Sequence, residues 1–259
     1  MLLTVDVGNT NITLGVYADD ELVGAWRVGT VHGRMPDEYG LQFVGLLRHK
    51  GIEGEQLHGA ALASVVPPLT PTIMEALDRY LGQTPLVVGA GVKTGVRIKY
   101  EDPKAVGADR VVDAAAVQWL YSVPACVVDF GTATTFDAID RQGDYLGGAI
   151  APGIGIAADA LFQRTAKLTR VELVPPPAAI GRNTVHAMQS GLVFGYVGLV
   201  EGMVDRFRSE LGQDMIVVGT GGLAPVIAAE TKVIDHVAPW LTLDGLRLIW
   251  GLNQAGAEE

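Results

Sequence analysis

The sequence predicts an α/β protein built from two similar halves. The first observation is a pair of like segments, Asp6-Val-Gly-Asn-Thr and Asp129-Phe-Gly-Thr-Ala, which lie almost half of the 259 residues apart. The second is that each segment follows a short apolar run and precedes another run of β-forming residues, as in a hairpin. The third is that a three-strand meander followed by helices is predicted once in each half. We therefore expect a duplicated domain whose two aspartate loops face each other.

The first half is expected to start with an antiparallel meander and to continue with alternating helices and strands. Short turns at Asn9-Thr10-Asn11 and Asp19-Asp20 separate the first three runs. Thr70-Pro71 and Gly82 mark the start and the end of one helix, because a cap residue followed by proline begins helices and glycine ends them. Strands are predicted over residues 2–7, 12–17, 21–28, 59–66 and 85–88, and helices over 37–49, 70–81 and 109–120.

The second half is expected to repeat this order with additions. After a proline loop, a long helix over 184–211 is predicted to break or bend near Gly195 or Gly198. Strands are predicted over residues 125–128, 134–139, 145–150 and 215–218, and helices from residue 155 and over 243–254. This order is that of the actin/hexokinase-type, ribonuclease H-like duplicated fold. In that fold each lobe has a mixed five-stranded sheet flanked by helices, with a nucleotide in the cleft between lobes. We place the lobes at residues 1–115 and 116–259.

Composition and charge narrow the functional classes. Apolar residues make up 49% of the chain and charged residues 19%, which is a globular composition. The net charge of −10 and the lack of a basic run disfavour a nucleic-acid partner, because lysine and arginine hold such partners. The single cysteine, Cys126, lies in an apolar run and is expected to be a buried, reduced thiol. Because we find neither a leader peptide nor a run expected to span a bilayer, we expect a cytoplasmic protein without a membrane partner.

The first aspartate loop has the composition of a phosphate-binding turn. Gly8 lets the backbone approach a phosphate closely, while Asn9, Thr10 and Asn11 add side-chain donors to the N–H groups of the turn. Asp6 cannot bind phosphate directly, so we expect it to hold Mg²⁺ through water. An ordinary Asx-rich hairpin turn would also use these residue types. The second copy of the pattern in the other half favours the phosphate loop.

Two further glycine-rich segments match a dinucleotide-binding pattern only weakly. Gly219-Thr-Gly-Gly follows a predicted strand and precedes a helix, a setting in which a nucleotide can pass over the backbone. This segment and Gly153-Ile-Gly-Ile-Ala-Ala both match Gly-x-Gly-x-x-Ala, yet neither opens a βαβ unit at the first strand. The sequence contains no Gly-Lys-Ser or Gly-Lys-Thr, and its five histidines lack metal-binding spacing.

Two predicted helix starts carry residues that suit either a structural or a functional role. Asp109, in Gly107-Ala-Asp-Arg, can act as a general base that orients a substrate hydroxyl for attack on phosphorus. It can equally be an acid favoured by the helix dipole, and Arg110 can hold it or bind a substrate carboxylate. Thr184, in Gly181-Arg-Asn-Thr, is both a natural N-cap and a candidate ligand contact.

Together and in this order, these motifs resemble those of type III pantothenate kinases, members of the acetate/sugar kinase–Hsp70–actin superfamily. The resemblance covers almost the whole chain. Its motifs are Asp6-Val-Gly-Asn-Thr-Asn, Gly107-Ala-Asp-Arg, Asp129-Phe-Gly-Thr-Ala-Thr-Thr, Gly147-Gly-Ala-Ile-Ala-Pro-Gly, Gly181-Arg-Asn-Thr and Thr220-Gly-Gly. It implies ATP-dependent phosphorylation of pantothenate to 4'-phosphopantothenate, the first step of coenzyme A biosynthesis. It also implies a homodimer whose interface includes the helix from Thr184 and whose second subunit helps close the pantothenate site.

The resemblance further implies roles for residues at the matching positions. Asp109 would accept the proton of the pantothenate hydroxyl, and Asp129 would bind a monovalent cation, K⁺ or NH₄⁺. Mg²⁺ would accompany ATP near Asp6. The implied ATP contacts are Asp6, Val7, Gly8, Asn9, Thr10, Asn11, Ile12, Thr13 and Thr132. The implied pantothenate contacts are Tyr100, Gly107, Ala108, Asp109, Arg110 and Thr184.

Two other functions are compatible with the sequence. One is a different small-molecule kinase of the same superfamily, which a panel of acceptor substrates with ATP would distinguish. The other is a regulator that keeps the fold without turnover, which would bind nucleotide but not consume it. The presence of Asp6, Asp109 and Asp129 argues against this regulator. Residue patterns alone predict a two-lobed nucleotide phosphotransferase, and pantothenate as the substrate comes from the resemblance.

Overall fold

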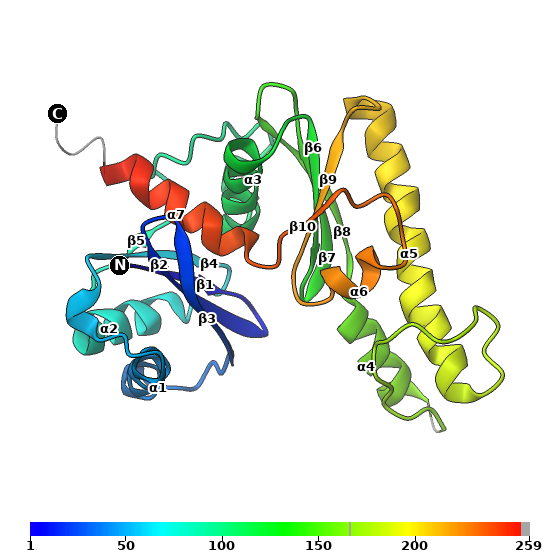
Figure 1. Cartoon of the computed structure of the whole chain (residues 1–259), viewed down its shortest axis with the longest axis horizontal. Helices are drawn as coiled ribbons and strands as arrows, with labels where there is room; N and C mark the ends of the chain where they lie inside the picture. Colours follow the sequence, from blue (N-terminus) through cyan, green and yellow to red (C-terminus); the bar gives the residue numbers. More distant parts are fainter. Residues whose placement is uncertain (166, 255–259) are drawn as a thin grey trace. The chain divides into compact units, whose positions relative to one another are not determined.

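The computed structural model describes residues 1–165 and 167–254, which form two compact units (Figure 1). Among these residues, the first unit consists of 1–96, 102–116 and 242–254. The second unit consists of 97–101 and 117–241. Each unit is built around one five-stranded sheet, so the prediction of two mixed five-stranded sheets flanked by helices is confirmed.

The sheet of the first unit has the strand order β3-β2-β1-β4-β5. The pairs β1–β2 and β2–β3 are antiparallel, whereas β1–β4 and β4–β5 are parallel. Asp19, in the second hairpin turn, has a left-handed φ of 51°, which aspartate tolerates in turns. The strands are β1 (Leu2–Val7), β2 (Asn11–Ala18), β3 (Glu21–Gly29), β4 (Gly59–Ser64) and β5 (Leu86–Val87).

Helices cover both faces of this first sheet, and the alternation along β4 shows which helices cover which face. Ala60 and Leu62 pack in a cluster with α1 (Pro36–His49) and α2 (Thr70–Leu81). Ala61 and Ala63 pack in another cluster with α3 (Ala108–Leu120) and α7 (Leu241–Gln254). Because successive strand side chains point to opposite faces, the two helix pairs lie on opposite faces of the sheet. Two 3₁₀ turns, η1 (Gly54–Gln56) and η2 (Pro103–Ala105), complete the unit.

The sheet of the second unit repeats this topology. Its strand order is β10-β9-β6-β7-β8, in which β6 takes the central place that β1 has in the first sheet. β1 and β6 also share one burial pattern, with a half-buried aspartate, Asp6 or Asp129, in the fifth position. Cys126 on β6 is fully buried, as predicted. The strands are β6 (Ala125–Phe130), β7 (Ala133–Ile139), β8 (Tyr145–Pro152), β9 (Ile216–Thr220) and β10 (His236–Val237); the helices are α4 (Ile154–Arg164), α5 (Thr184–Leu211) and α6 (Ala224–Ala228).

Two helix starts differ from the prediction in their capping residue. Thr70 is already the first helical residue of α2, with Pro71 in the first turn. The side chain of Asn183, not that of Thr184, caps α5 by accepting a hydrogen bond from the N–H of His186 at 2.8 Å. The N-cap is the last residue before the helical backbone begins, and both threonines lie one position beyond it. The end of α2 at Gly82 (φ 64°) is as predicted.

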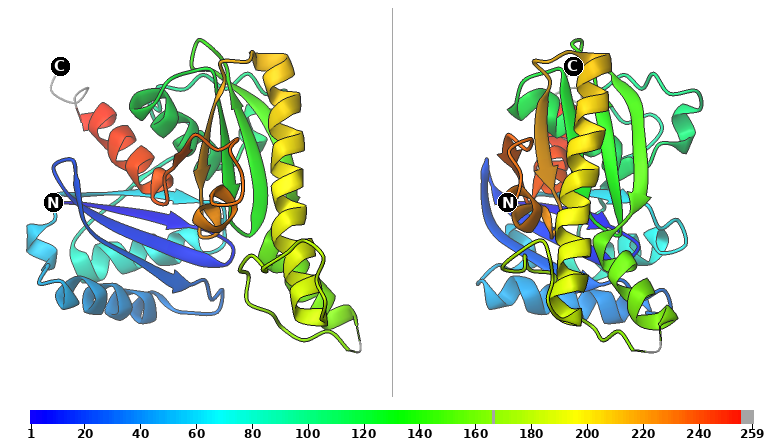
Figure 2. Two further views of the ribbon diagram at one scale, coloured as in Figure 1. Left: turned by 45° about the vertical axis from the view of Figure 1, so that its right-hand side comes forward. Right: turned by 90° about the vertical axis from the view of Figure 1, so that its right-hand side faces the viewer.

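Helix α5 is unbroken through Gly195 and Gly198, where a break or bend was expected. Within the described part of the chain, it is the one helix whose length and mean hydropathy of 1.2 match a membrane span, and 39% of that window is buried. Figure 2 shows α5 running along the second sheet. Buried side chains of α5 pack in the core of the second unit, which accounts for its apolar character: Leu192, Val193, Val197, Val200 and Val204.

The division of the chain differs from the boundary expected after residue 115. Residues 97–101 join the second unit, and α7 groups with the first unit although residues 116–259 were expected to form one lobe. The reason is packing, since Leu246 and Ile249 of α7 share a cluster with α3 and β4. α7 approaches α3 so closely that a Cβ at Gly245 would lie 2.3 Å from the carbonyl oxygen of Val112. Tyr17 adds a hydrogen bond of 2.7 Å from its hydroxyl to Asp244.

Replacement of Leu246 by alanine should destabilise the protein by about 2–5 kcal/mol, because it leaves a cavity between α7, α3 and β4. Leu246 is fully buried, whereas Leu41 on α1 is 65% exposed, so Leu41→Ala is the matched control and should change stability by less than about 0.5 kcal/mol. Urea denaturation followed by tryptophan fluorescence measures both. Equal effects of the two substitutions would contradict the docking of α7 in the first unit.

Candidate active site

The turn between β1 and β2 is held by backbone hydrogen bonds and leaves its polar side chains exposed. The N–H of Gly8 donates to the carbonyl of Asn11 at 3.0 Å. Thr30, just after β3, fixes the turn from the side, because its hydroxyl donates to the carbonyl of Gly8 at 2.7 Å and its N–H to that of Thr10 at 2.9 Å. Asn9, Thr10 and Asn11 are exposed. A ligand can therefore be contacted by these side chains without loss of the bonds that shape the turn.

Asp6 lies near the carboxyl end of the central strand, on one particular face of the sheet. Its Cα is paired with Thr13 of β2 on one side and with Ala63 of β4 on the other. Val5 and Val7 point into the core with α1 and α2, so the side chain of Asp6 points to the opposite face. That face is the one covered by α3 and α7. The strand pairing therefore fixes both the position and the direction of this carboxylate.

Asp109 lies in the first turn of α3, at the same edge of the first sheet. A Cβ at Gly107 would lie 2.6 Å from the carboxylate of Asp109 and 3.3 Å from the side chain of Val65, which follows β4. The N–H of Val65 donates to the carbonyl of Val7 at 3.0 Å. The ends of β1 and β4 and the start of α3 thus meet at one edge. The structure brings Asp109 to the edge that carries the Asp6 loop.

The environment of Asp109 disfavours its charged form. Burial raises the pKa of this carboxyl above its ordinary value, and the N–H and positive charge of Arg110 offset only part of that rise. The N–H of Arg110 donates to the carboxylate at 2.8 Å and holds it in place. A shielded, oriented carboxylate with a raised pKa is a stronger base than a solvated one, which is the property that a general base needs.

Asp129 occupies the corresponding place in the second unit and is enclosed by two glycine turns. Its Cα pairs with Thr135 of β7 and with Thr220 of β9. A Cβ placed on Gly131 would lie 3.1 Å from the carboxylate of Asp129, and a Cβ placed on Gly221 would lie 2.4 Å from it. Gly221 also has a φ of 88°, a conformation that favours glycine. The glycines of the Gly219-Thr-Gly-Gly segment therefore allow the backbone to pass beside Asp129. The weak match of this segment to a dinucleotide-binding pattern did not predict that role.

The other candidate residues of the second unit lie around the Asp129 loop and on separate elements. Thr132, in that loop, is exposed. Its carbonyl oxygen would lie 2.2 Å from a Cβ at Gly153, so the residue that precedes α4 packs closely against the loop. Tyr100, in the segment before α3, is 42% exposed. Thr184 is exposed at the first turn of α5.

Sequence reasoning missed two supports of these loops. Thr30 bonds the Asp6 loop, and Gly153 makes room for the Asp129 loop. Only the strand pairing reveals the first, because Thr30 is distant in sequence from Gly8. The second had a signal, since Gly153 belongs to a glycine-rich motif that sequence analysis noted without a function.

Metal binding by protein side chains alone is not supported in the described residues, which contain no group of three or more histidine, cysteine, aspartate or glutamate side chains. Asp6 and Asp129 are each a single carboxylate near a strand end. Mg²⁺ is commonly held by one or two carboxylates together with substrate phosphates and water. The residues present therefore fit a metal that arrives with a nucleotide and not a resident metal cluster.

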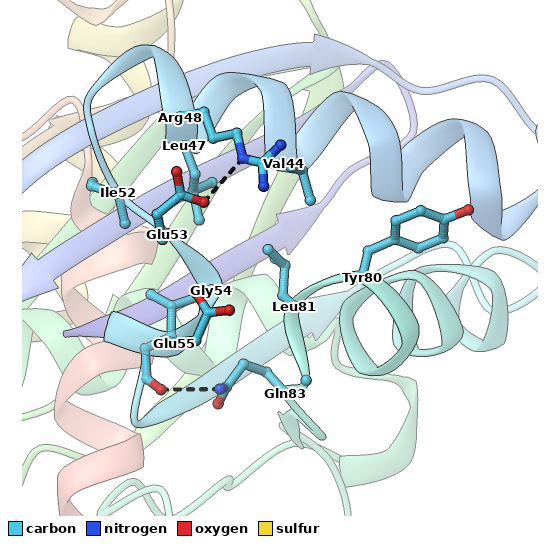
Figure 3. Close-up of a pocket in the computed structure, with 12 residues that line it drawn as sticks. Val44, Leu47, Arg48, Ile52, Glu53, Gly54, Glu55, Tyr80, Leu81 and Gln83 are labelled. Carbon is cyan, nitrogen blue, oxygen red and sulfur yellow. Dashed lines mark hydrogen bonds and ion pairs between the residues drawn. The ribbon is translucent and has the colours of Figure 1, made fainter.

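A pocket of about 350 Å³ lies elsewhere in the first unit (Figure 3). It is lined by the ends of α1 and α2 and by η1, which precedes β4, so it is at the amino end of strands whose carboxyl ends carry the candidate residues. An ion pair of 3.0 Å between Arg48 and Glu53 lies at its rim. None of the predicted ATP or pantothenate contacts lines this pocket.

Comparison with known proteins places these observations in one family. A family model described as type III pantothenate kinase matches residues 2–206. A type III pantothenate kinase from Moorella thermoacetica is 55% identical over 253 residues, which cover 98% of this chain and 100% of that protein. One from Dehalococcoides mccartyi is 50% identical over 254 residues, 98% of each chain.

A solved structure supports the fold independently. Component A of (R)-2-hydroxyglutaryl-CoA dehydratase from Acidaminococcus fermentans matches 98% of each chain with a TM-score of 0.53. Its identity of 14% limits the similarity to the fold. The duplicated sheets, the two aspartate loops and the matches over nearly the whole length agree with one another. This chain belongs to the type III pantothenate kinase family.

Proposed function

We propose that this protein transfers the γ-phosphoryl group of ATP to the primary hydroxyl of pantothenate. The product is 4'-phosphopantothenate, and the reaction is the first step of coenzyme A biosynthesis. The observation that carries the proposal is the position of Asp109, a shielded carboxylate at the sheet edge that also carries the Asp6 loop. Membership of the family supplies the identity of the acceptor.

The Asp6 loop is proposed to contact the phosphates of ATP. The loop offers exposed side chains and turn N–H groups that can surround an anion. We propose that the contacts come from residues 6–13, and from Thr132 in the corresponding loop of the second unit. Mg²⁺, held by Asp6 through water, would offset the charge of the phosphates. Phosphoryl transfer needs alignment and charge neutralisation more than covalent help from the protein, and fixed loops suit that need.

Asp109 is proposed to accept the proton of the pantothenate hydroxyl as the oxygen attacks phosphorus. The hydrogen bond from the N–H of Arg110 orients the carboxylate. Gly107 and Ala108 leave space beside it, because neither carries a side chain larger than a methyl group. The guanidinium of Arg110 is proposed to bind the carboxylate of pantothenate, a bidentate interaction that arginine favours. Tyr100 and Thr184 are the remaining proposed contacts.

Asp129 is proposed to bind a monovalent cation, K⁺ or NH₄⁺. The Gly131 and Gly221 turns bring backbone close to its carboxylate, without a side chain between them that would keep an ion away. A cation there would offset the negative charge of the nucleotide and the carboxylate.

A homodimer that uses α5 and its surroundings is also proposed. The second unit exposes several large apolar side chains on β8, α4, α5 and the segment between those helices. Exposed apolar groups of this number on neighbouring elements are typical of an interface. They are Ile150, Ile156, Leu161, Phe162, Val174, Ile180 and Val185, of which Ile180 is 83% exposed. The buried, reduced state expected for Cys126 agrees with the proposed cytoplasmic location.

Asp109→Asn should lower kcat by about 10²- to 10⁴-fold, because the amide cannot accept the hydroxyl proton. ATP affinity should be nearly unchanged, since Asp109 is not among the proposed contacts of ATP. An ADP-release assay with pantothenate measures the rate, and calorimetry measures ATP binding. A variant that keeps near-normal turnover would exclude Asp109 as the base.

The same substitution should raise thermal stability at neutral pH. Burial raises the pKa of Asp109, so the folded state opposes ionisation of this carboxyl. The protein therefore loses stability as the pH rises from the pKa of the unfolded state, about 3.9, through the higher pKa of the folded state. Asparagine removes that penalty, and the gain in Tm should disappear as pH falls towards about 4. Glu101→Gln, at an exposed carboxylate, is the control and should show no such pH-dependent gain. A loss of stability for Asp109→Asn at pH 7 would contradict this account.

Replacement of potassium by tetramethylammonium at constant ionic strength should reduce activity, because the larger ion cannot reach the carboxylate between two glycine turns. Potassium or ammonium added back should restore the rate. In Asp129→Asn, the difference between the two salts should shrink. Equal rates of the wild-type protein in both salts would rule out the cation site.

A further inference from the structure

The chain between β5 and α3 joins the second unit for only five residues. Residues 97–101 belong to the second unit, whereas the residues before and after them belong to the first. This short segment carries Tyr100, a proposed pantothenate contact, while Asp109, the proposed base, belongs to the first unit. What holds the segment in the second unit therefore determines where Tyr100 lies.

Backbone hydrogen bonds tie the segment to the start of β8. Ile98 forms a parallel bridge with Tyr145. The N–H of Tyr145 donates to the carbonyl of Arg97 at 2.9 Å, and the N–H of Lys99 donates to the carbonyl of Tyr145 at 2.8 Å. These two bonds fix the residues on both sides of Ile98 but include neither polar group of Tyr100.

Lys99 supplies a second attachment through its ammonium group. Its Nζ lies 2.9 Å from the carboxylate of Asp140 and 2.7 Å from that of Asp144, at the two ends of the β7–β8 turn. The carboxylates are only 14% and 15% exposed, so solvent screens these contacts less than it screens an open surface pair. Asp140 also accepts the N–H of Asp144 at 3.0 Å, which keeps the turn closed. The ammonium is therefore attached to a turn that is itself fixed.

The ring of Tyr100 rests on groups of the same region. Its centroid lies 6.5 Å from that of Tyr145, with the planes inclined at 55°. A Cβ at Gly147 would be 3.2 Å from two ring carbons of Tyr100, so the ring lies directly over this glycine. Tyr145 is fully buried, and its hydroxyl donates to Asp137 at 2.9 Å. One side of the Tyr100 ring thus packs on Gly147 and Tyr145, while its exposed side is available to a ligand.

The chain after Tyr100 gives it little support. Residues 101–105 are all exposed and contain only the short turn η2, capped by Asp102 through the N–H of Lys104 at 3.1 Å. If the attachment at Lys99 is removed, this exposed stretch offers no buried contact that would keep Tyr100 over Gly147. Loss of Lys99 should loosen Tyr100 without unfolding either sheet.

We propose that Lys99 is a positioning residue for the acceptor alcohol. By linking residues 97–101 to Asp140 and Asp144 it holds Tyr100 over Gly147, where the ring contacts pantothenate. The inference rests on the proposed function, because it takes Tyr100 as a substrate contact. Lys99 acts through Tyr100 and not as a charge that attracts the substrate, since its ammonium is already bound to two carboxylates.

The test compares Lys99→Met with Lys104→Met. Both substitutions remove one positive charge from the same stretch of chain, but Lys104 is exposed, and within residues 1–165 and 167–254 its side chain forms no hydrogen bond or ion pair. Lys99→Met should raise the KM for pantothenate about 3- to 10-fold, as expected from loss of a partly shielded ionic contact, with little change in kcat or in the KM for ATP. Lys104→Met should leave all three constants within about 2-fold. Lys99→Arg, which can still bridge the two carboxylates, should recover most of the affinity.

Hydrogen exchange of the peptide that contains residues 97–101 gives a readout independent of turnover. Protection of the Lys99 amide should fall in Lys99→Met and stay unchanged in Lys104→Met, because that amide donates to Tyr145. A double-mutant cycle with Asp144→Asn should be non-additive for the KM of pantothenate, since the two side chains are in contact.

The outcomes separate this inference from the proposed function. A wild-type protein that does not phosphorylate pantothenate refutes the proposed function, whatever the exchange data show. An active wild-type protein with an unchanged KM in Lys99→Met overturns the positioning role, even if protection is lost. Equal rises of KM in Lys99→Met and Lys104→Met would point to bulk charge and overturn it as well.

Discussion

The pairing of the central strand in each sheet is the constraint on which the other features depend. β1 and β6 are each paired antiparallel on one side and parallel on the other, so every backbone group near their carboxyl ends is placed by a neighbour. An aspartate near the end of such a strand has little freedom in its Cα position. Asp6 and Asp129 owe their fixed positions to this pairing. The polar turns that follow β1 and β6 are anchored by these paired strands, and the hydroxyl of Thr30 adds a hydrogen bond to the first turn.

Small residues make the rest of the arrangement possible. Ala61 and Ala63 of β4 let α3 and α7 pack on the sheet at the face towards which Asp6 points. Gly245 allows α7 to touch the backbone of α3, and Gly107 leaves room for the carboxylate of Asp109. A larger side chain at any of these places would move α3, and with it the proposed base. In the first unit, the packing of the core therefore also sets the position of the proposed base.

The second unit uses glycine for a different purpose. Gly131 and Gly221 border the carboxylate of Asp129, and Gly147 lies under the ring of Tyr100. In each place a Cβ would crowd the side chain of a proposed site residue. The glycines of the chain thus include several at which backbone closely approaches the side chain of a proposed site residue, in addition to ordinary turns. Lys99, with its two carboxylate partners, complements this by holding a short segment that has almost no core of its own.

Much of the fold and part of the site followed from the sequence, because both depend on local patterns. Alternating apolar residues and polar turns predicted the strands around Asp6 and Asp129, and the repeat of that pattern predicted two alike sheets. Capping residues were less well predicted, since Asn183 and Thr184 are both good caps and only the backbone decides between them. The two-residue strand β10 was not predicted, because both of its residues are exposed and no apolar run marks it.

The sequence by itself determined the duplicated topology, the identity of the polar loops and the residue types suited to phosphoryl transfer, since each is written in a short stretch of chain. The tertiary structure alone decided that α7 belongs with the first unit, that residues 97–101 belong with the second, and that Asp109 shares a sheet edge with Asp6. These facts depend on which surfaces become buried against each other. Burial is set by contacts between residues far apart in the sequence, such as Leu246 with Ala61, and no local pattern records them.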